Sequence, residues 1–178
     1  MNVSSHAKSR VLQLLYVDDS PIDRLLVKEA VLMTETPFKF YEAAGVESAK
    51  SFFRVHLRDE ERCYPRPAVV LLDYELGKDR GTDFLYWLRV LKRIESIPVV
   101  MFSGSSGKAD VEECYAAGAN YFVNKPTSLA RIKSIVRALF LSVSRPQQPP
   151  CPLSLLPEFV ADVRIHQPLR ESAVVQFN

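Results

Sequence analysis

Five short runs with strand character, four of them predominantly apolar, are each followed by a segment with helical periodicity, and this alternation limits the chain to an α/β architecture. The runs occupy residues 11–17, 38–43, 68–72, 97–102 and 121–124. Apolar residues in the intervening segments recur at three- and four-residue spacing, which is typical of helices that cover a sheet. Strands that alternate with helices in this way form a parallel sheet with helices on both faces. We therefore predict one doubly wound, five-stranded α/β domain.

Helix boundaries can be read at several points of the chain. Ser20 is suited to cap a helix whose first residue is Pro21, and Gly118 is suited to end another helix in a left-handed conformation. The expected helices span residues 20–33, 46–57, 82–94, 108–117 and 128–143. In the first of these helices the following apolar residues recur at helical spacing: Ile22, Leu25, Leu26, Ala30 and Met33.

Composition divides the 178 residues into a body and two terminal segments. We expect an N-terminal extension at residues 1–10, the α/β domain at residues 11–144 and a tail at residues 145–178 that holds six of the twelve prolines. The tail has the composition of an extended linker, with one short helix expected near residues 158–165, and it is too short for a separate effector domain. Its apolar pieces also suit an arm that docks on the body or is exchanged in a homodimer.

The bulk composition argues against several classes of function. A net charge of +2 gives no electrostatic basis for direct binding to nucleic acid or to a membrane surface. Three widely spaced cysteines argue against a disulfide framework or a zinc site and favour a reducing compartment. The N-terminal segment lacks the apolar core of a signal peptide, and no apolar stretch has the length of a membrane helix. We therefore expect a cytoplasmic protein.

Chemically active residues stand where the apolar runs stop. Asp18 and Asp19 follow the first run and Asp73 follows the third, while Ser103 and Lys125 follow the last two. The carboxyl ends of parallel strands open onto one rim of a sheet, and such sheets bind ligands at that rim. We therefore predict that these side chains share one pocket, although more than a hundred positions separate the first from the last.

This set of side chains suits magnesium-assisted phosphoryl chemistry. Carboxylates about 4 Å apart repel one another by roughly 4 kcal/mol per pair at an effective dielectric near 20, and a divalent cation reverses that interaction. Mg²⁺ prefers hard oxygen ligands, and the candidates are the carboxylates of Asp18, Asp19 and Asp73 and the backbone carbonyl of Glu75. Lys125 would meet a phosphoryl oxygen as a point charge, and Ser103 would donate a hydrogen bond to another.

In their order and strand-end placement, Asp18-Asp19, Asp73, Ser103-Gly104 and Lys125-Pro126 resemble the receiver domain of two-component response regulators. The resemblance covers about residues 10–143. It implies a flavodoxin-like fold with strand order 2-1-3-4-5, and a phosphoryl group transferred to Asp73 from a sensor histidine kinase with Mg²⁺ as cofactor. It also implies a phosphoacceptor switch rather than an enzyme. Phosphorylation would engage Ser103 and Lys125 and change the surface of the fourth helix, fifth strand and fifth helix for a partner.

Three positions refine what the resemblance implies. Phe122 stands at the position of the family's switch aromatic, where many members carry a tyrosine, so its ring can pack inward but cannot form a hydrogen bond. Glu75 and Ser105 lie two residues after Asp73 and Ser103, respectively. We expect Glu75 and Ser105 to set the lifetime of the phosphorylated state.

Two further features resemble a narrower group within the family. The long segment at residues 90–97 and the body without an attached effector resemble the small single-domain regulators that serve bacterial phytochrome-type kinases. This narrower resemblance implies a phytochrome-type histidine kinase as a candidate partner.

Other interpretations of the same residues stay open. Taken singly, Asp18-Asp19 suit the entry to a helix, where the helix dipole favours negative charge, and Asp73 suits an ordinary turn. A phosphohydrolase would use Asp73 as a transient nucleophile and Glu75 as the acid, and a binding module of the same fold would work without phosphorylation. Turnover of p-nitrophenyl phosphate would favour the hydrolase, whereas stoichiometric labelling that decays would favour the switch.

Overall fold

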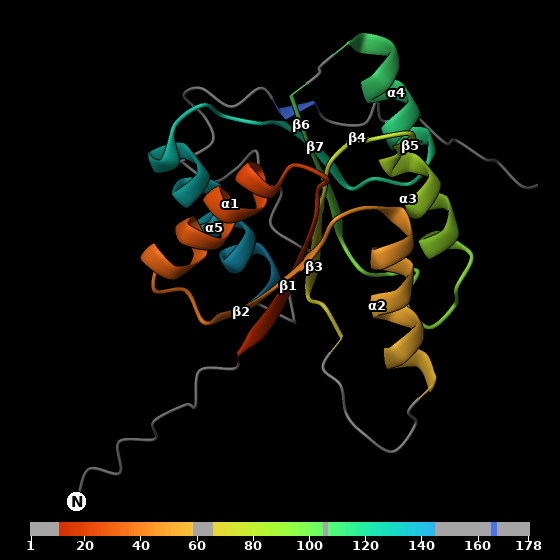
Figure 1. Cartoon of the computed structure of the whole chain (residues 1–178), viewed down its shortest axis with the longest axis horizontal. Coiled ribbons are helices and arrows are strands. Elements are labelled where there is room, and N and C mark those ends of the chain that lie inside the picture. Colours follow the sequence, from red (N-terminus) through yellow and green to blue (C-terminus); the bar gives the residue numbers. More distant parts are fainter. Residues whose placement is uncertain (1–10, 59–65, 105–106, 145–164, 167–178) are drawn as a thin grey trace, which may run out of the picture.

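The computed structural model describes residues 11–58, 66–104, 107–144 and 165–166, which contain a parallel sheet covered by helices on both faces (Figure 1). The parallel strands are β1 (Leu12–Val17), β2 (Phe38–Ala43), β3 (Val69–Leu72), β6 (Val99–Ser103) and β7 (Tyr121–Asn124). They lie side by side in the order β2-β1-β3-β6-β7. This arrangement confirms the doubly wound fold and the predicted order of the five parallel strands.

Five helices form the two outer layers of the described structure. Helices α1 (Pro21–Met33) and α5 (Leu129–Val143) lie on one face of the sheet (Figure 1). The opposite face carries α2 (Val46–Arg58), α3 (Gly81–Arg89) and α4 (Lys108–Ala116). Because strand side chains alternate between faces, Leu14 and Tyr16 of β1 join the core under α1 and α5, whereas Leu15 and Val17 join the other core.

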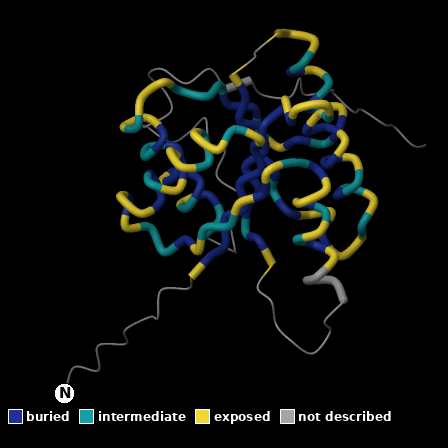
Figure 2. Tube along the Cα trace, viewed as in Figure 1, coloured by how far each residue is buried: buried dark blue, intermediate teal, exposed yellow. Residues whose placement is uncertain are grey.

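The central strands β1, β3 and β6 are buried at every position, as expected for strands with helices on both sides (Figure 2). Several helix termini have the capping residues that the sequence predicted. Ser20 and Ser128 accept hydrogen bonds from the third helical residues of α1 and α5, and Gly118 has the expected left-handed φ of 98°. No helix in the described ranges has both the length and the apolarity to cross a bilayer.

Helix α1 differs from the sequence expectation in the side that it buries. Its buried residues are Val27, Ala30 and Val31, which contact α5 and the sheet. Of the five apolar residues noted at helical spacing, four are exposed: Ile22, Leu25, Leu26 and Met33. The helix carries apolar residues on two sides, so periodicity alone does not decide which side faces the core.

Helix α3 ends at Arg89, five residues before the predicted end at residue 94, and residues 90–97 form turns before β6. The Arg89 guanidinium donates hydrogen bonds to the backbone carbonyls of Glu95, Ile97 and Gly118. These bonds satisfy carbonyl groups of the segment after α3 and of the turn after α4. The early end of α3 is therefore stabilised by a tertiary contact.

A short hairpin follows Asp73 and has no counterpart in the sequence prediction. It consists of β4 (Glu75–Leu76) and β5 (Asp79–Arg80), which pair antiparallel around Gly77 with φ 68°. The chain returns to α3 at Gly81, where a Cβ atom would lie 2.1 Å from the carbonyl oxygen of Asp73. Only glycine tolerates this approach. The hairpin is thereby held directly against the end of β3.

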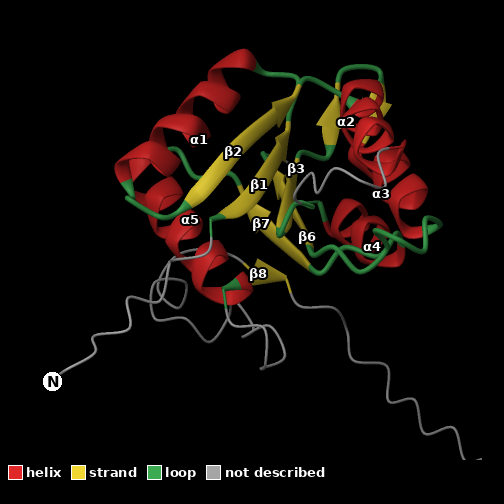
Figure 3. Cartoon of the chain, turned by 90° about the horizontal axis from the view of Figure 1, so that it is seen from below, coloured by secondary structure: helices red, strands yellow, loops and turns green. Residues whose placement is uncertain are grey.

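The sheet also has a sixth strand that the sequence did not predict. β8 (Ile165–His166) pairs antiparallel with β7, and its residues lie opposite Phe122 and Val123 (Figure 3). Ile165 therefore lies in a strand and not at the end of a helix, whereas the other residues of the helix predicted at 158–165 lie outside the described residues. The β7 edge of the sheet thus carries a strand from the tail.

Candidate functional site

Backbone pairing brings the polar strand ends to one rim of the sheet. Asp73 donates its backbone N–H to the carbonyl of Val17 at the end of β1 (2.9 Å). Lys125, directly after β7, donates its backbone N–H to the carbonyl of Ser103 at the end of β6 (2.8 Å). The parallel strands therefore place these residues at the same rim of the sheet, where the carboxyl ends of the strands lie.

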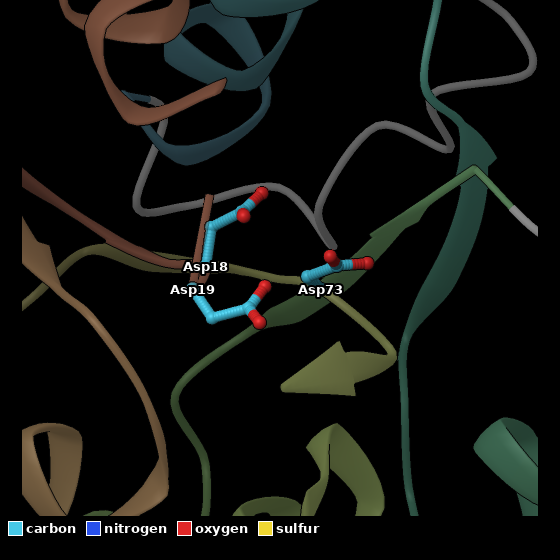
Figure 4. A group of neighbouring side chains, drawn as sticks. All are labelled: Asp18, Asp19 and Asp73. Atoms are coloured by element: carbon cyan, nitrogen blue, oxygen red, sulfur yellow. The ribbon is translucent and has the colours of Figure 1, made fainter. Parts of the chain in front are cut away.

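The carboxylates of Asp18, Asp19 and Asp73 form an acidic cluster at this rim (Figure 4). One oxygen atom from each lies within 4.8 Å of the others. Asp18 and Asp73 are buried, whereas Asp19 is exposed. Oxygen ligands lie about 2 Å from Mg²⁺, so two opposite ligands are about 4 Å apart. Three hard oxygen atoms at this spacing fit one divalent cation after small side-chain rotations.

The ammonium group of Lys125 lies among three carboxylates. Its Nζ atom is 2.7 Å from Asp18 Oδ2, 2.8 Å from Asp73 Oδ2 and 2.9 Å from Asp23 Oδ2. Burial alone would lower the pKa of Lys125, but its hydrogen bonds to the three carboxylates raise the pKa above its ordinary value. Lys125 is therefore a permanent cation beside the acidic cluster.

The carboxyl group of Asp73 has a perturbed pKa. Burial raises its pKa above the usual value, and the charge of Asp18 acts in the same direction. The hydrogen bond from Lys125 and the 2.7 Å hydrogen bond from the Tyr74 backbone N–H to Oδ1 oppose this shift. A buried carboxylate with an adjacent ammonium group is a nucleophile whose charge is balanced but poorly hydrated.

Asp18 is fixed in place by hydrogen bonds from β1 and the start of α1. The Tyr16 hydroxyl donates to Oδ2 and the Ser20 backbone N–H donates to Oδ1 (2.8 Å). Arg24 Nη1 donates to the Asp18 carbonyl (2.6 Å). Burial, followed by the hydrogen bond to Asp18, raises the pKa of Tyr16, so that its hydroxyl remains a donor. Asp18 therefore keeps one orientation toward the pocket.

A second polar cluster connects the loop after Asp73 to α4. Glu113 of α4 accepts hydrogen bonds from the Tyr74 hydroxyl (2.9 Å), from Arg80 Nη1 (2.7 Å) and from Thr82 Oγ1 (2.9 Å). Tyr74 follows the central carboxylate directly in the chain, so this cluster couples the position of α4 to the loop that carries Asp73. The sequence does not signal it, because its members are ordinary surface residue types when taken singly.

The remaining site residues named from the sequence have different surroundings. Ser103 is 1% exposed at the end of β6, and Phe122 is fully buried in the core under α2, α3 and α4. Glu75 is exposed in β4, opposite Arg80. Ser105 lies outside the described residues.

Asp23 is a site residue that the sequence did not indicate. By its position it is an ordinary acid in the first turn of α1, where the helix dipole favours negative charge. Its place five residues after Asp18 is the one available signal, because the turn between β1 and α1 folds back over the strand end.

Comparison with known proteins assigns the chain to a family. Residues 14–137 match the response regulator receiver domain. The response regulator Rre1 of Synechocystis sp. is 32% identical over 128 residues, which are 72% of this chain and 51% of that protein. The chain thus spans about half the length of the first curated relatives that it matches.

Two solved structures are similar in both sequence and fold. The Mn²⁺-bound form of the response regulator Rcp1 is 26% identical with a TM-score of 0.59, and the match covers 72% of this chain and 91% of that one. The phosphorylated cyanobacterial phytochrome response regulator RcpA is 25% identical with a TM-score of 0.62, and the match covers 73% and 91%. The chain belongs to the response regulator receiver domain family.

Proposed function

We propose that this chain is a phosphorylation switch that accepts a phosphoryl group on Asp73 from a sensor histidine kinase. The observation that carries the proposal is the convergence of Asp73 with two further carboxylates and the Lys125 ammonium group at one rim of the sheet. In the transfer, a carboxylate oxygen of Asp73 forms a bond to phosphorus as the phosphorus–nitrogen bond of phosphohistidine breaks. Positioning and charge neutralisation supply most of the catalysis in such reactions.

The donor set supports Mg²⁺ as the cofactor. Asp18, Asp19 and Asp73 would hold the ion, and the backbone carbonyl of Glu75 is proposed as a further ligand. When bound, the ion supplies positive charge to the oxygens of the transferred group. The similar Rcp1 structure is a Mn²⁺-bound form, which supports a divalent cation at the rim of this chain as well.

Lys125 and Ser103 are proposed to bind the phosphoryl oxygens. Lys125 already contacts Asp73 at 2.8 Å, and Ser103 is buried at the end of the adjacent strand. Movement of Ser103 toward the phosphoryl group would shift the connection between β6 and α4. Phe122 is already fully buried, so the proposed change concerns how its ring packs below α4 and not whether it enters the core. The output surface would be α4, β7 and α5.

Several finer points belong to the same proposal. Glu75 is exposed next to the site and, with Ser105, is proposed to set the lifetime of the phosphorylated state. A phytochrome-type kinase as donor is supported by the similarity to RcpA, a phytochrome response regulator. A cytoplasmic location and a homodimer formed through the tail are proposed from the sequence.

The test is labelling of the purified chain with radioactive phosphoramidate in the presence of Mg²⁺. Wild-type protein should incorporate at most one phosphoryl group per chain, in an acid-labile form that decays. Asp73→Asn should abolish incorporation, because the amide is not a nucleophile toward phosphorus. Asp79→Asn, in the adjacent hairpin, is the matched control and should label normally. Equal labelling of Asp73→Asn and wild type, or no labelling of wild type, would contradict the proposal.

A further inference from the structure

We propose that Asp23 is a positioning residue that restrains the Lys125 ammonium group and thereby sets the affinity of the site for a phosphoryl group. The inference rests on the proposed function and extends it to a residue of α1. Asp23 Oδ2 lies 2.9 Å from Lys125 Nζ, although the two residues are 102 positions apart in the sequence. Asp23 is not part of the acidic cluster and is therefore not among the candidate ligands of a divalent ion.

The three donors of the Lys125 ammonium group are matched by three acceptors. The distances to Asp18, Asp73 and Asp23 are 2.7, 2.8 and 2.9 Å, and an ammonium group has three N–H bonds. A phosphoryl oxygen can therefore bind Lys125 only when one of these carboxylates gives up its hydrogen bond.

The surroundings of the three carboxylates indicate which one gives way. Asp18 also accepts from the Tyr16 hydroxyl and the Ser20 backbone N–H, and Asp73 also accepts from the Tyr74 backbone N–H. The Asp18 and Asp73 side chains are 0% and 8% exposed, whereas that of Asp23 is 36% exposed. Water can solvate the Asp23 carboxylate when the lysine leaves, so this hydrogen bond is the least costly to break.

The charge of Asp23 also acts on the incoming group. A phosphoryl group brings negative charge to Lys125, and Asp23 both competes for the same ammonium and repels that charge. Replacing Asp23 by asparagine retains an acceptor oxygen of the same size but removes the competing charge. Asp23 is therefore expected to weaken phosphoryl binding in the native protein, in favour of a switch that returns readily to its resting state.

The experiment measures binding of beryllofluoride, a phosphoryl mimic, to the full chain at saturating Mg²⁺. Asp23→Asn should lower the Kd about fivefold, the upper range for a partly exposed charge pair. Asp23→Glu keeps the charge and should leave the Kd near wild type. Asp83→Asn is the matched control, because Asp83 is the acidic residue at the third position of α3, as Asp23 is in α1. The Kd of this variant for beryllofluoride should equal that of the wild type.

Measurements in a second protein background, in which Lys125 is replaced, distinguish a purely structural role of Asp23 from positioning of the ammonium group. In Lys125→Gln, adding Asp23→Asn should lower the Kd much less than in the wild-type background, because the competition for the ammonium group is gone and only the weaker direct repulsion remains. An unchanged or higher Kd for Asp23→Asn in the wild-type background, or an equal effect with and without Lys125, would overturn the inference. If wild-type protein binds no beryllofluoride and is not labelled by phosphoramidate, the proposed function fails and this inference fails with it.

Discussion

At the residue scale, Asp73 combines two conflicting requirements. Its carboxylate is buried beside another buried carboxylate, which favours the neutral form, yet the phosphoryl transfer that we propose requires the ionised form. Lys125 and the Tyr74 backbone N–H reduce the conflict without removing it, since the pKa of Asp73 stays above its usual value. A pKa that stays perturbed in this way is consistent with the proposed chemical role of Asp73.

The raised pKa of Asp73 predicts a stability effect with a definite sign. The native state holds the proton of Asp73 more tightly than the unfolded state, so the contribution to stability is complete below the unfolded pKa and is lost as pH rises through the folded pKa. Without divalent cations at pH 7, Asp73→Asn should therefore raise the free energy of unfolding, because the amide removes a buried charge that the native state disfavours.

Urea denaturation of both proteins measures this difference. The gain should shrink as pH falls toward the usual aspartate value of 3.8, where the wild-type carboxyl group also becomes protonated. Asp79→Asn, in β5, is the control for loss of an aspartate charge outside the pocket and should show a smaller change. A destabilised Asp73→Asn protein at pH 7 would mean that the ion pair with Lys125 outweighs the cost of burial.

At the element scale, α1 carries two apolar sides, and only one of them is used by the described fold. Val27, Ala30 and Val31 pack toward α5 and the sheet, whereas Ile22 and Leu25 are 69% and 56% exposed. These exposed residues lie in the first turns of the helix that begins at the acidic cluster. Under the proposed function the phosphoryl donor is a protein, so we infer that these exposed apolar side chains beside the site form a docking surface for that donor.

This surface predicts a difference between protein and small-molecule phosphodonors. Leu25→Ser should slow phosphoryl transfer from a histidine kinase that serves this chain about tenfold, because burial of a leucine side chain contributes roughly 1.5–3 kcal/mol. Labelling by phosphoramidate should not change, since the pocket is intact. Leu32→Ser, at a leucine of similar exposure near the far end of α1, is the matched control. Equal slowing with both donors would place the effect in the pocket and not in docking.

At the scale of the whole molecule, the layered fold makes ligand binding a source of stability. The carboxylates of the cluster come from the ends of β1 and β3, so a cation that binds all three joins parts of the chain that separate on unfolding. A ligand that binds only the native state stabilises it by mass action. Helices on both faces leave the rim of the sheet as the place where such a ligand can enter.

Mg²⁺ at about 100 times its Kd should therefore raise the free energy of unfolding by about 2.7 kcal/mol. Thermal melts with and without Mg²⁺ measure the effect, with a monovalent salt of equal ionic strength as the control. Asp19→Asn should reduce the stabilisation at little cost to the apo protein, because Asp19 is exposed. The stabilisation should weaken as pH falls through the pKa of Asp73, since the proton and the cation compete. An equal gain in Asp19→Asn would remove Asp19 from the ligand set.

The sequence alone was sufficient for the parallel strands and for most of the site. Short apolar runs identified the buried strands, and the carboxyl ends of parallel strands share one rim. Asp18, Asp73 and Lys125 could therefore be placed together from the sequence. This inference does not require knowledge of any side-chain contact between distant segments, because the pairing of the strand backbones alone brings the strand ends together.

Tertiary structure decided the features that depend on a choice between equivalent local patterns. Helix α1 has two apolar sides, and only packing against α5 selected the one with Val27 and Ala30. Three other features join segments that are far apart in the chain, so no local sequence pattern predicts them. They are the contact between Asp23 and Lys125, the cluster around Glu113 and the pairing of β8 with β7. Local sequence determines conformations that a few neighbouring residues can enforce, whereas these contacts form only once the whole sheet has positioned their partners.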